Sequence, residues 1–313
     1  MEPASHNAVL IICLALPIYF VGIILPSFAL NGIIVLTFAR TKKLHTPSNL
    51  LSVHVSIIGL VTLLIYSTVS IPAFALALIK CDYDLVYYKW MAAHVLHFGL
   101  YPLNIAAISL SYCLILKYSS SVLSFLYVGV IIFFMWSAAI IGNAPIPFLV
   151  PFRKFVSCSR ELCLNSTYVC YNFHGAFTPN LFSFQSGIFF LIQDIIFIII
   201  PLILVLVSTT LSYTIFKASI VHPDNSLKIR MILLPIIMTA TYLFLIVGQN
   251  IINWVPITMD TNNMPRDIIP LLFGLSWDLS SVIYPIIILY FNIPLRKASW
   301  NLILSFIGRA SNK

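Results

Sequence analysis

The stretch SSVIYPIIILYFNIPLRKAS, residues 280–299, contains the features that decide the fold. It begins as an apolar run of the kind that crosses a membrane, yet it holds a proline, Pro285, and it ends in a basic pair. A proline removes one helical hydrogen bond and kinks the helix, which neighbouring polar groups tolerate inside a bundle. Beyond Asn292 the apolar residues recur at helical spacing opposite the basic pair. This pattern predicts an amphipathic surface helix over 293–307 that lies on an anionic leaflet.

The composition of the whole chain agrees with a membrane environment. Of its 313 residues, 60% are hydrophobic and 8% are charged, whereas soluble domains carry about 25% charged residues. The net charge of +8 indicates the positive-inside bias of a membrane protein rather than a nucleic-acid partner. We find no glycine-rich phosphate loop and no serine nucleophile motif, so we expect neither a cofactor nor an enzyme.

Seven segments are apolar over the ~20 residues that a spanning helix needs. They cover 10–39, 48–72, 90–116, 122–149, 183–216, 228–253 and 268–291. With the N-terminus outside, most lysines and arginines fall on the cytoplasmic side, as the positive-inside rule requires. We therefore predict an all-α protein of the plasma membrane, with a single seven-transmembrane helix bundle over 1–313 and the lipid bilayer around it.

Four of the six cysteines fall on the predicted outer side, where disulfides form and persist. They are Cys81, Cys158, Cys163 and Cys170. Four cysteines allow three pairings, and the spacing does not choose among them. The triplet that begins at Asn165 is an N-glycosylation acceptor sequence in the same predicted outer loop.

Two carboxylates lie inside the apolar segments, where a charge is costly and usually marks a functional site. Asp194 and Asp278 each precede a helix proline by seven residues, so both lie in the outer half of the bundle. His94 and His97 lie at a similar depth and share one helix face. Gln249 and Trp277 complete the candidate ligand-binding residues.

These residues support two readings that can both hold. Two carboxylates form a pocket suited to a small amine or diamine ligand. Alternatively, an aspartate pairs with one of the histidines as an internal latch, because buried charges are normally paired. A histidine near neutral pH changes its charge easily, so replacing His94 or His97 should shift the pH–response curve. The two histidines and two aspartates could also bind a metal, but their spacing favours no metal site. A transporter is disfavoured because no paired repeats are apparent.

Several motifs together resemble the rhodopsin-like G-protein-coupled receptors, nearest to olfactory and trace-amine-type chemosensory receptors. The most specific is KLHTPSNLL at 43–51, which is similar to their first inner loop. The other matching positions are LNGIIV at 30–35, Trp136, Pro201 with Tyr213, Pro285, and NIPLR at 292–296.

The resemblance implies a small-molecule ligand in the outer half and a heterotrimeric G protein at the inner face. It implies that Cys81 pairs with Cys163 and Cys158 with Cys170, and that Asp194 contacts an amine. The switch region would include Ser111, Tyr112, Tyr213, Pro285 and Tyr290.

The chain also departs from that family at positions that matter for signalling. Gly59 stands where the family has its sodium-binding aspartate, and Ser111 stands at the arginine of the Asp-Arg-Tyr motif. Tyr284 replaces the asparagine before Pro285, and Ile288 replaces the following tyrosine. Either the receptor couples through different contacts, or it is a ligand-binding seven-helix protein without G-protein signalling.

Overall fold

The computed structural model describes residues 20–65, 94–118, 124–144, 191–218, 225–247 and 279–311. Over these ranges the chain is almost entirely helical and contains no strand. The helical segments in chain order are η1 (Phe20–Ile24), α2 (Leu25–Arg40), η2 (Lys42–Leu44), α3 (Pro47–Ile65), η4 (His94–Leu100), α6 (Tyr101–Tyr118), α7 (Phe125–Asn143), η6 (Ile195–Ile199), α12 (Ile200–Ala218), α13 (Asn225–Tyr242), η7 (Leu243–Val247), the helix Leu279–Phe291, and α16 (Ile293–Ser311).

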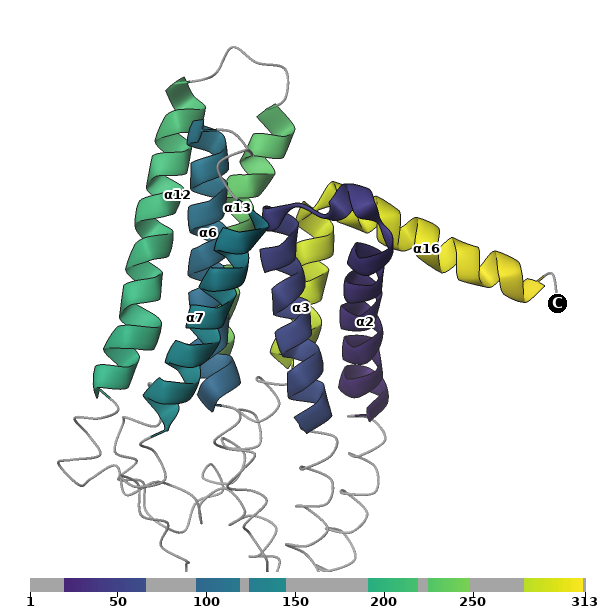
Figure 1. Ribbon diagram of the computed structural model, residues 1–313, viewed down its shortest axis with the longest axis horizontal. Helices are drawn as coiled ribbons and strands as arrows, with labels where there is room; N and C mark the ends of the chain where they lie inside the picture. The colour runs from purple at the N-terminus through teal and green to yellow at the C-terminus, as the bar shows by residue number, and fades with distance from the viewer. Residues whose placement is uncertain are drawn as a thin grey trace, which may run out of the picture.

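The prediction of an all-α membrane protein is confirmed. Within the described ranges, six helices are long and apolar enough to cross a membrane, or seven if the bent pair Leu279–Phe291 and Ile293–Gly308 counts as one span. The 107° bend in that pair carries α16 away from the bundle axis, as Figure 1 shows at the upper end of the molecule. The surface helix predicted over 293–307 is therefore present as a helix that leaves the bundle.

Capping residues set where several of these helices begin. Thr46 precedes Pro47, and its hydroxyl accepts a hydrogen bond from the backbone N–H of Asn49 at 3.3 Å, which is the arrangement expected of an N-cap followed by proline. Ser124 caps α7 in the same way by accepting from the N–H of Tyr127 at 3.2 Å. The starts of α3 and α7 thus follow from local sequence.

The helix α6 forms the centre of the bundle, with α12, α13, α3 and α7 around it (Figure 1). Of its membrane span, 67% of the residues are buried, against 17% for α7. Its core residues include Ile105 and Ile108, which are almost fully buried. The two helices are both strongly apolar, so α7 uses its apolar surface mainly toward lipid.

In three of the described spans a π-helical turn is followed, one residue later, by a proline. The turn η1 precedes Pro26 in α2, η4 precedes Pro102 in α6, and η6 precedes Pro201 in α12. A proline ring clashes with the carbonyl four residues earlier and supplies no N–H, and a local π-turn is one way in which a helix adapts. Such turns occur frequently at functional sites, and all three lie at the end of the bundle opposite α16.

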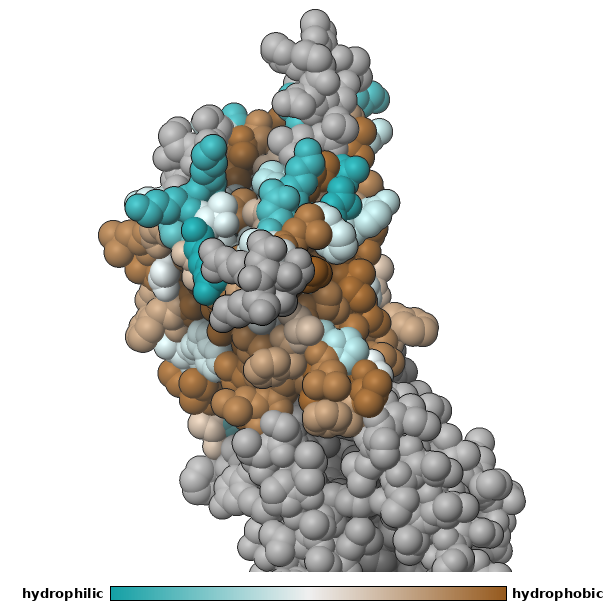
Figure 2. Space-filling view, turned by 90° about the vertical axis from the view of Figure 1, so that its right-hand side faces the viewer, coloured by the Kyte–Doolittle hydropathy of each residue, from teal (hydrophilic) through white to brown (hydrophobic). Residues whose placement is uncertain are grey.

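Charge divides the two ends of the described bundle. Every lysine and arginine in the described ranges lies at the end where α16 departs, hereafter the α16 end, and they are Arg40, Lys42, Lys43, Lys117, Lys217, Lys228, Arg230, Arg296, Lys297 and Arg309. The acidic residue that the structure describes, Asp194, lies toward the opposite end, hereafter the far end. Figure 2 shows hydrophilic residues above a broad apolar belt, as expected of a chain that spans a bilayer.

Candidate functional site

An aromatic stack joins two helices at the far end of the bundle. The His97 ring lies 5.3 Å from the ring of Tyr101, and the Tyr101 ring lies 4.9 Å from the ring of Tyr284. His97 and Tyr101 come from η4 and the start of α6, and Tyr284 comes from the helix Leu279–Phe291. The Ser280 hydroxyl also lies 3.5 Å from His97 Nδ1. The stack therefore holds these two helices together at one level of the bundle.

Three tyrosine hydroxyls are buried around this stack. Tyr101 and Tyr284 are 0% exposed and Tyr242, on α13, is 3% exposed. The hydroxyl groups of Tyr242 and Tyr284 have no hydrogen-bond partner among the residues that the structure describes. The Tyr101 hydroxyl makes no hydrogen bond of normal geometry there either, but it faces Ser280. Leaving such a group unsatisfied costs about 1–3 kcal/mol, and native structures rarely do so without a reason. We refer to Tyr101, Tyr242 and Tyr284 as the tyrosine cluster.

Asp194 lies at the same end of the molecule as the tyrosine cluster. It is partly buried, directly precedes η6, and acts electrostatically on the Tyr242 phenol. Its neighbour Gln193 is buried and donates a hydrogen bond to the side-chain oxygen of Asn143 on α7. The carboxylate predicted as a ligand contact is therefore near the tyrosine cluster, on a helix turn fixed from its other side.

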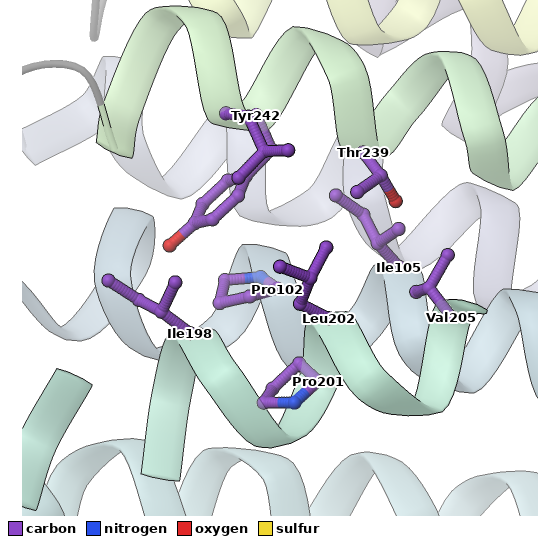
Figure 3. A pocket seen from close by; sticks show the side chains of 9 residues that line it. Pro102, Ile105, Ile198, Pro201, Leu202, Val205, Thr239 and Tyr242 are labelled. Carbon is purple, nitrogen blue, oxygen red and sulfur yellow. The ribbon is translucent and has the colours of Figure 1, made fainter. Parts of the chain in front are cut away.

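A small cavity lies beside Tyr242, between α6, α12 and α13 (Figure 3). Its volume is about 10 Å³, which is the size of a single water molecule. Drug-sized ligands occupy about 300–1,000 Å³, so this cavity is too small to be a ligand pocket by itself. The residues around it are Pro102, Ile105, Ile198, Pro201, Leu202, Val205, Thr239, Tyr242 and Leu243.

Figure 3 shows the Tyr242 hydroxyl pointing toward Ile198 of η6. The carbonyl of Phe197 lies in that turn, and the residue four positions on is Pro201, which offers it no N–H. The Thr239 hydroxyl beside the cavity is likewise without a partner in the described ranges. Two polar groups of α13, the hydroxyls of Thr239 and Tyr242, thus lie beside a cavity whose other lining residues are apolar.

Only part of the predicted ligand site falls within the described residues. His97 and Asp194 are described, and His94 begins η4. Outside the described residues lie the other predicted ligand contacts, the outer cysteines and the glycosylation site: Gln249, Trp277, Asp278, Cys81, Cys158, Cys163, Cys170 and Asn165. In the described ranges no three histidine, cysteine or acidic residues gather as a metal site.

The predicted switch residues occupy different environments along the bundle. Ser111 and Tyr112 are buried in α6, and the Ser111 hydroxyl donates to the carbonyl of Ile108 at 2.8 Å. Tyr213 is 58% exposed on α12. Pro285 is buried within the helix Leu279–Phe291, whereas Tyr290 near its end is exposed. The structure does not gather these residues into one cluster.

A second polar network, hereafter the histidine staple, joins α3, α6 and α7 through His54, Asn104 and Trp136. The Trp136 indole N–H donates to His54 Nε2 at 2.9 Å, and His54 Nδ1 lies 2.9 Å from Asn104 Oδ1. An indole N–H can only donate, so His54 carries its proton on Nδ1 and donates it to Asn104. The Asn104 amide then donates to the carbonyl of Leu51 at 3.2 Å.

Gly59 on α3 packs directly against the side chain of Asn31 on α2. A Cβ at Gly59 would lie 2.9 Å from Asn31 Oδ1, so the Asn31 side chain fills the space that a carboxylate would need. Asn31 Nδ2 donates to the carbonyls of Ser27 and Ser281, each at 2.8 Å. This contact ties α2 to the helix Leu279–Phe291, and a side chain at position 59 would require the Asn31 side chain to move.

The tyrosine cluster and the histidine staple were not among the candidate residues predicted from sequence. One signal was available, because tyrosine prefers the membrane interfaces and Tyr101, Tyr242 and Tyr284 all lie within apolar spans. The meeting of the three side chains was not predictable, since it depends on the rotation of three helices about their axes.

Comparison with known proteins adds no identity: no family model matches this chain, and no curated protein is significantly similar to it.

Proposed function

We propose that this protein is a chemosensory-type G-protein-coupled receptor of the rhodopsin-like class, located in the plasma membrane. A small ligand would bind in the outer half of the bundle, at the far end, and amines are the first class to test. Binding would shift an equilibrium between closed and open arrangements of the α16 end.

The observation that carries this proposal is the tyrosine cluster. Its hydroxyls come from α6, α13 and the helix Leu279–Phe291, so a molecule that bonds to them contacts three helices at once. Asp194 supplies a negative charge nearby, and tyrosine rings attract cations through their faces. The tyrosine cluster would form the floor of the ligand site; the predicted contacts Gln249, Trp277 and Asp278 lie outside the described residues.

The α16 end suits a cytoplasmic role. Its lysines and arginines favour the cytoplasmic side by the positive-inside rule, and α16 carries exposed apolar residues such as Trp300 and Ile307 beside its basic residues. Such a helix lies on an anionic leaflet. A heterotrimeric G protein is the partner that this arrangement and the receptor-like motifs support.

The test is a G-protein activation assay against an amine panel, with ligand binding measured in parallel. Replacing Asp194 or Asp278 by Asn keeps the shape of the side chain and removes its charge. Losing a hydrogen bond to a charged group weakens binding by about 10- to 100-fold. Thr210→Val, at an exposed position of α12, serves as the control and should leave potency unchanged. An amine response that neither Asp substitution alters would contradict the carboxylate pocket.

The alternative is a ligand-binding seven-helix protein that does not signal through G proteins. One observation favours it: at the place of the family's arginine, the chain has a buried serine whose hydroxyl bonds within its own helix. A thermal shift with an amine, but no nucleotide exchange on any G-protein class, would support this alternative. Uptake of the amine into vesicles would instead support a transporter.

A further inference from the structure

An arginine on α13 reaches the end of the helix Leu279–Phe291 at the α16 end. Arg230 Nη1 donates to the backbone carbonyl of Tyr290 at 3.1 Å. The guanidinium carbon lies 6.0 Å from the centre of the Tyr290 ring, at the limit of a cation–π contact. Residues sixty positions apart in the chain are therefore joined by one side chain.

The covalent structure explains why the Tyr290 carbonyl is available. In a continuous helix this carbonyl would accept from the N–H four residues later, but that residue is Pro294, which has no N–H. The chain also leaves the helix at Asn292 and turns by 107° into α16. An arginine that bonds to a helix-terminal carbonyl satisfies it with a charged donor, which makes a stronger bond than a neutral one.

The other side of this corner is fixed by two asparagines. Asn292 Nδ2 donates to Asn49 Oδ1 at 2.8 Å, and Asn292 Oδ1 accepts from the N–H of Leu295 at 3.1 Å. Asn49 Nδ2 in turn donates to the carbonyl of Leu44 at 3.0 Å. The end of the helix Leu279–Phe291 is therefore anchored to α3 and η2, while Arg230 connects it to α13.

We propose that the contact between Arg230 and Tyr290 is a clasp that holds α13 against the helix Leu279–Phe291 and keeps the α16 end closed. Opening moves α13 away from the anchored corner and breaks this bond. The inference rests on the proposed receptor function, since only a switching bundle uses such a clasp. The clasp gives Arg230 of α13 a restraining role at the α16 end. On α6, Ser111 occupies the position at which the receptors that the sequence resembles have an arginine.

The test measures the closed arrangement directly, without ligand or G protein. Spin labels at the exposed positions Ile229 on α13 and Lys297 on α16 report the distance across the clasp. Arg230→Gln removes the charge, and we expect it to raise the ratio of long-distance to short-distance populations about fivefold. Arg230→Lys keeps the charge without the planar fork and should give a smaller rise. The native cysteines can also react with the spin label. The chain without the two introduced labelling positions, treated with the same label, measures that background.

Lys228→Gln is the matched control, because it removes the same charge from the same helix two residues earlier. We expect its distance distribution to equal that of the unsubstituted chain. Equal distributions for Arg230→Gln and the unsubstituted chain would overturn the clasp, as would a similar rise for Lys228→Gln. If Arg230→Gln fails to fold, the distance distribution of Arg230→Lys decides in its place. A distribution for Arg230→Lys equal to that of the unsubstituted chain would then overturn the clasp. Since no signalling is measured, a failed clasp is distinguishable from a failed receptor function.

Discussion

The histidine staple and the tyrosine cluster are both buried and polar, yet they differ in how completely their groups are bonded. In the staple, both ring nitrogens of His54 and the indole N–H of Trp136 have partners. In the tyrosine cluster, the hydroxyls of Tyr242 and Tyr284 have none within the described residues, and the Tyr101 hydroxyl faces only Ser280. A satisfied network specifies one packing, whereas an unsatisfied one is costly until something binds to it. The staple therefore fixes the packing of its helices, whereas the tyrosine cluster offers buried hydroxyls to the ligand that we propose.

The two groups also join different helices. The staple connects α3, α6 and α7, while the tyrosine cluster connects α6, α13 and the helix Leu279–Phe291. The central helix α6 belongs to both, so a change at the tyrosine cluster can act on α13 while the α3–α6–α7 frame stays in place. The clasp at Arg230 lies on the same side of α6 as the tyrosine cluster, because it too joins α13 to the helix Leu279–Phe291.

The largest effect is expected at the staple. His54→Ala deletes a buried ring and leaves Trp136 and Asn104 without their partner, so we expect a loss of about 3 kcal/mol of stability. Thermal unfolding in detergent measures it. His54→Gln, which can still accept from Trp136, should recover part of the loss. A melting temperature for His54→Ala equal to that of the unsubstituted protein would show that the staple is not a structural frame.

A smaller loss is expected where η4 touches α7. A Cβ at Gly99 would lie 2.7 Å from Cβ and 3.2 Å from Cα of Ala139, so Gly99→Ala forces two backbones apart. Overpacking of this kind costs about 1–3 kcal/mol. The matched control is Gly129→Ala on α7, where nothing lies within 4 Å; it should be neutral or slightly stabilising, since alanine favours helix. Equal melting temperatures for the two variants would contradict close packing between η4 and α7 at Gly99.

The smallest effect on stability is expected in the tyrosine cluster. Replacing Tyr101, Tyr242 or Tyr284 by Phe removes a hydroxyl that makes no hydrogen bond of normal geometry to a described residue, so the ligand-free protein should change by at most about 1 kcal/mol and can gain stability. Ser109→Ala is the contrasting control, because the Ser109 hydroxyl lies 2.6 Å from that of Ser208 and its loss should cost about 1 kcal/mol. The same Tyr→Phe variants should bind the amine more weakly. Losses above 2 kcal/mol in all three would mean that the tyrosine cluster is part of the frame.

The sequence alone determined the class of the protein and the course of its helices. Apolar runs of about 20 residues predicted the spans, and the stretch at 43–51 contains the Thr46 cap and the Pro47 start of α3. These signals are local, since hydropathy and capping depend on neighbours along the chain. The bend at Asn292 followed from the same kind of local pattern.

Only the tertiary structure decided which polar groups meet. The helices α3 and α7 have the same length and similar mean hydropathy, 1.9 and 2.2, yet 56% of one span and 17% of the other are buried. Lipid is as apolar as a protein core, so hydropathy cannot tell which face of a spanning helix points inward. The partners of His54, Tyr101 and Arg230 depend on how each helix is rotated and placed against the others, and that arrangement appears only when the whole bundle is assembled.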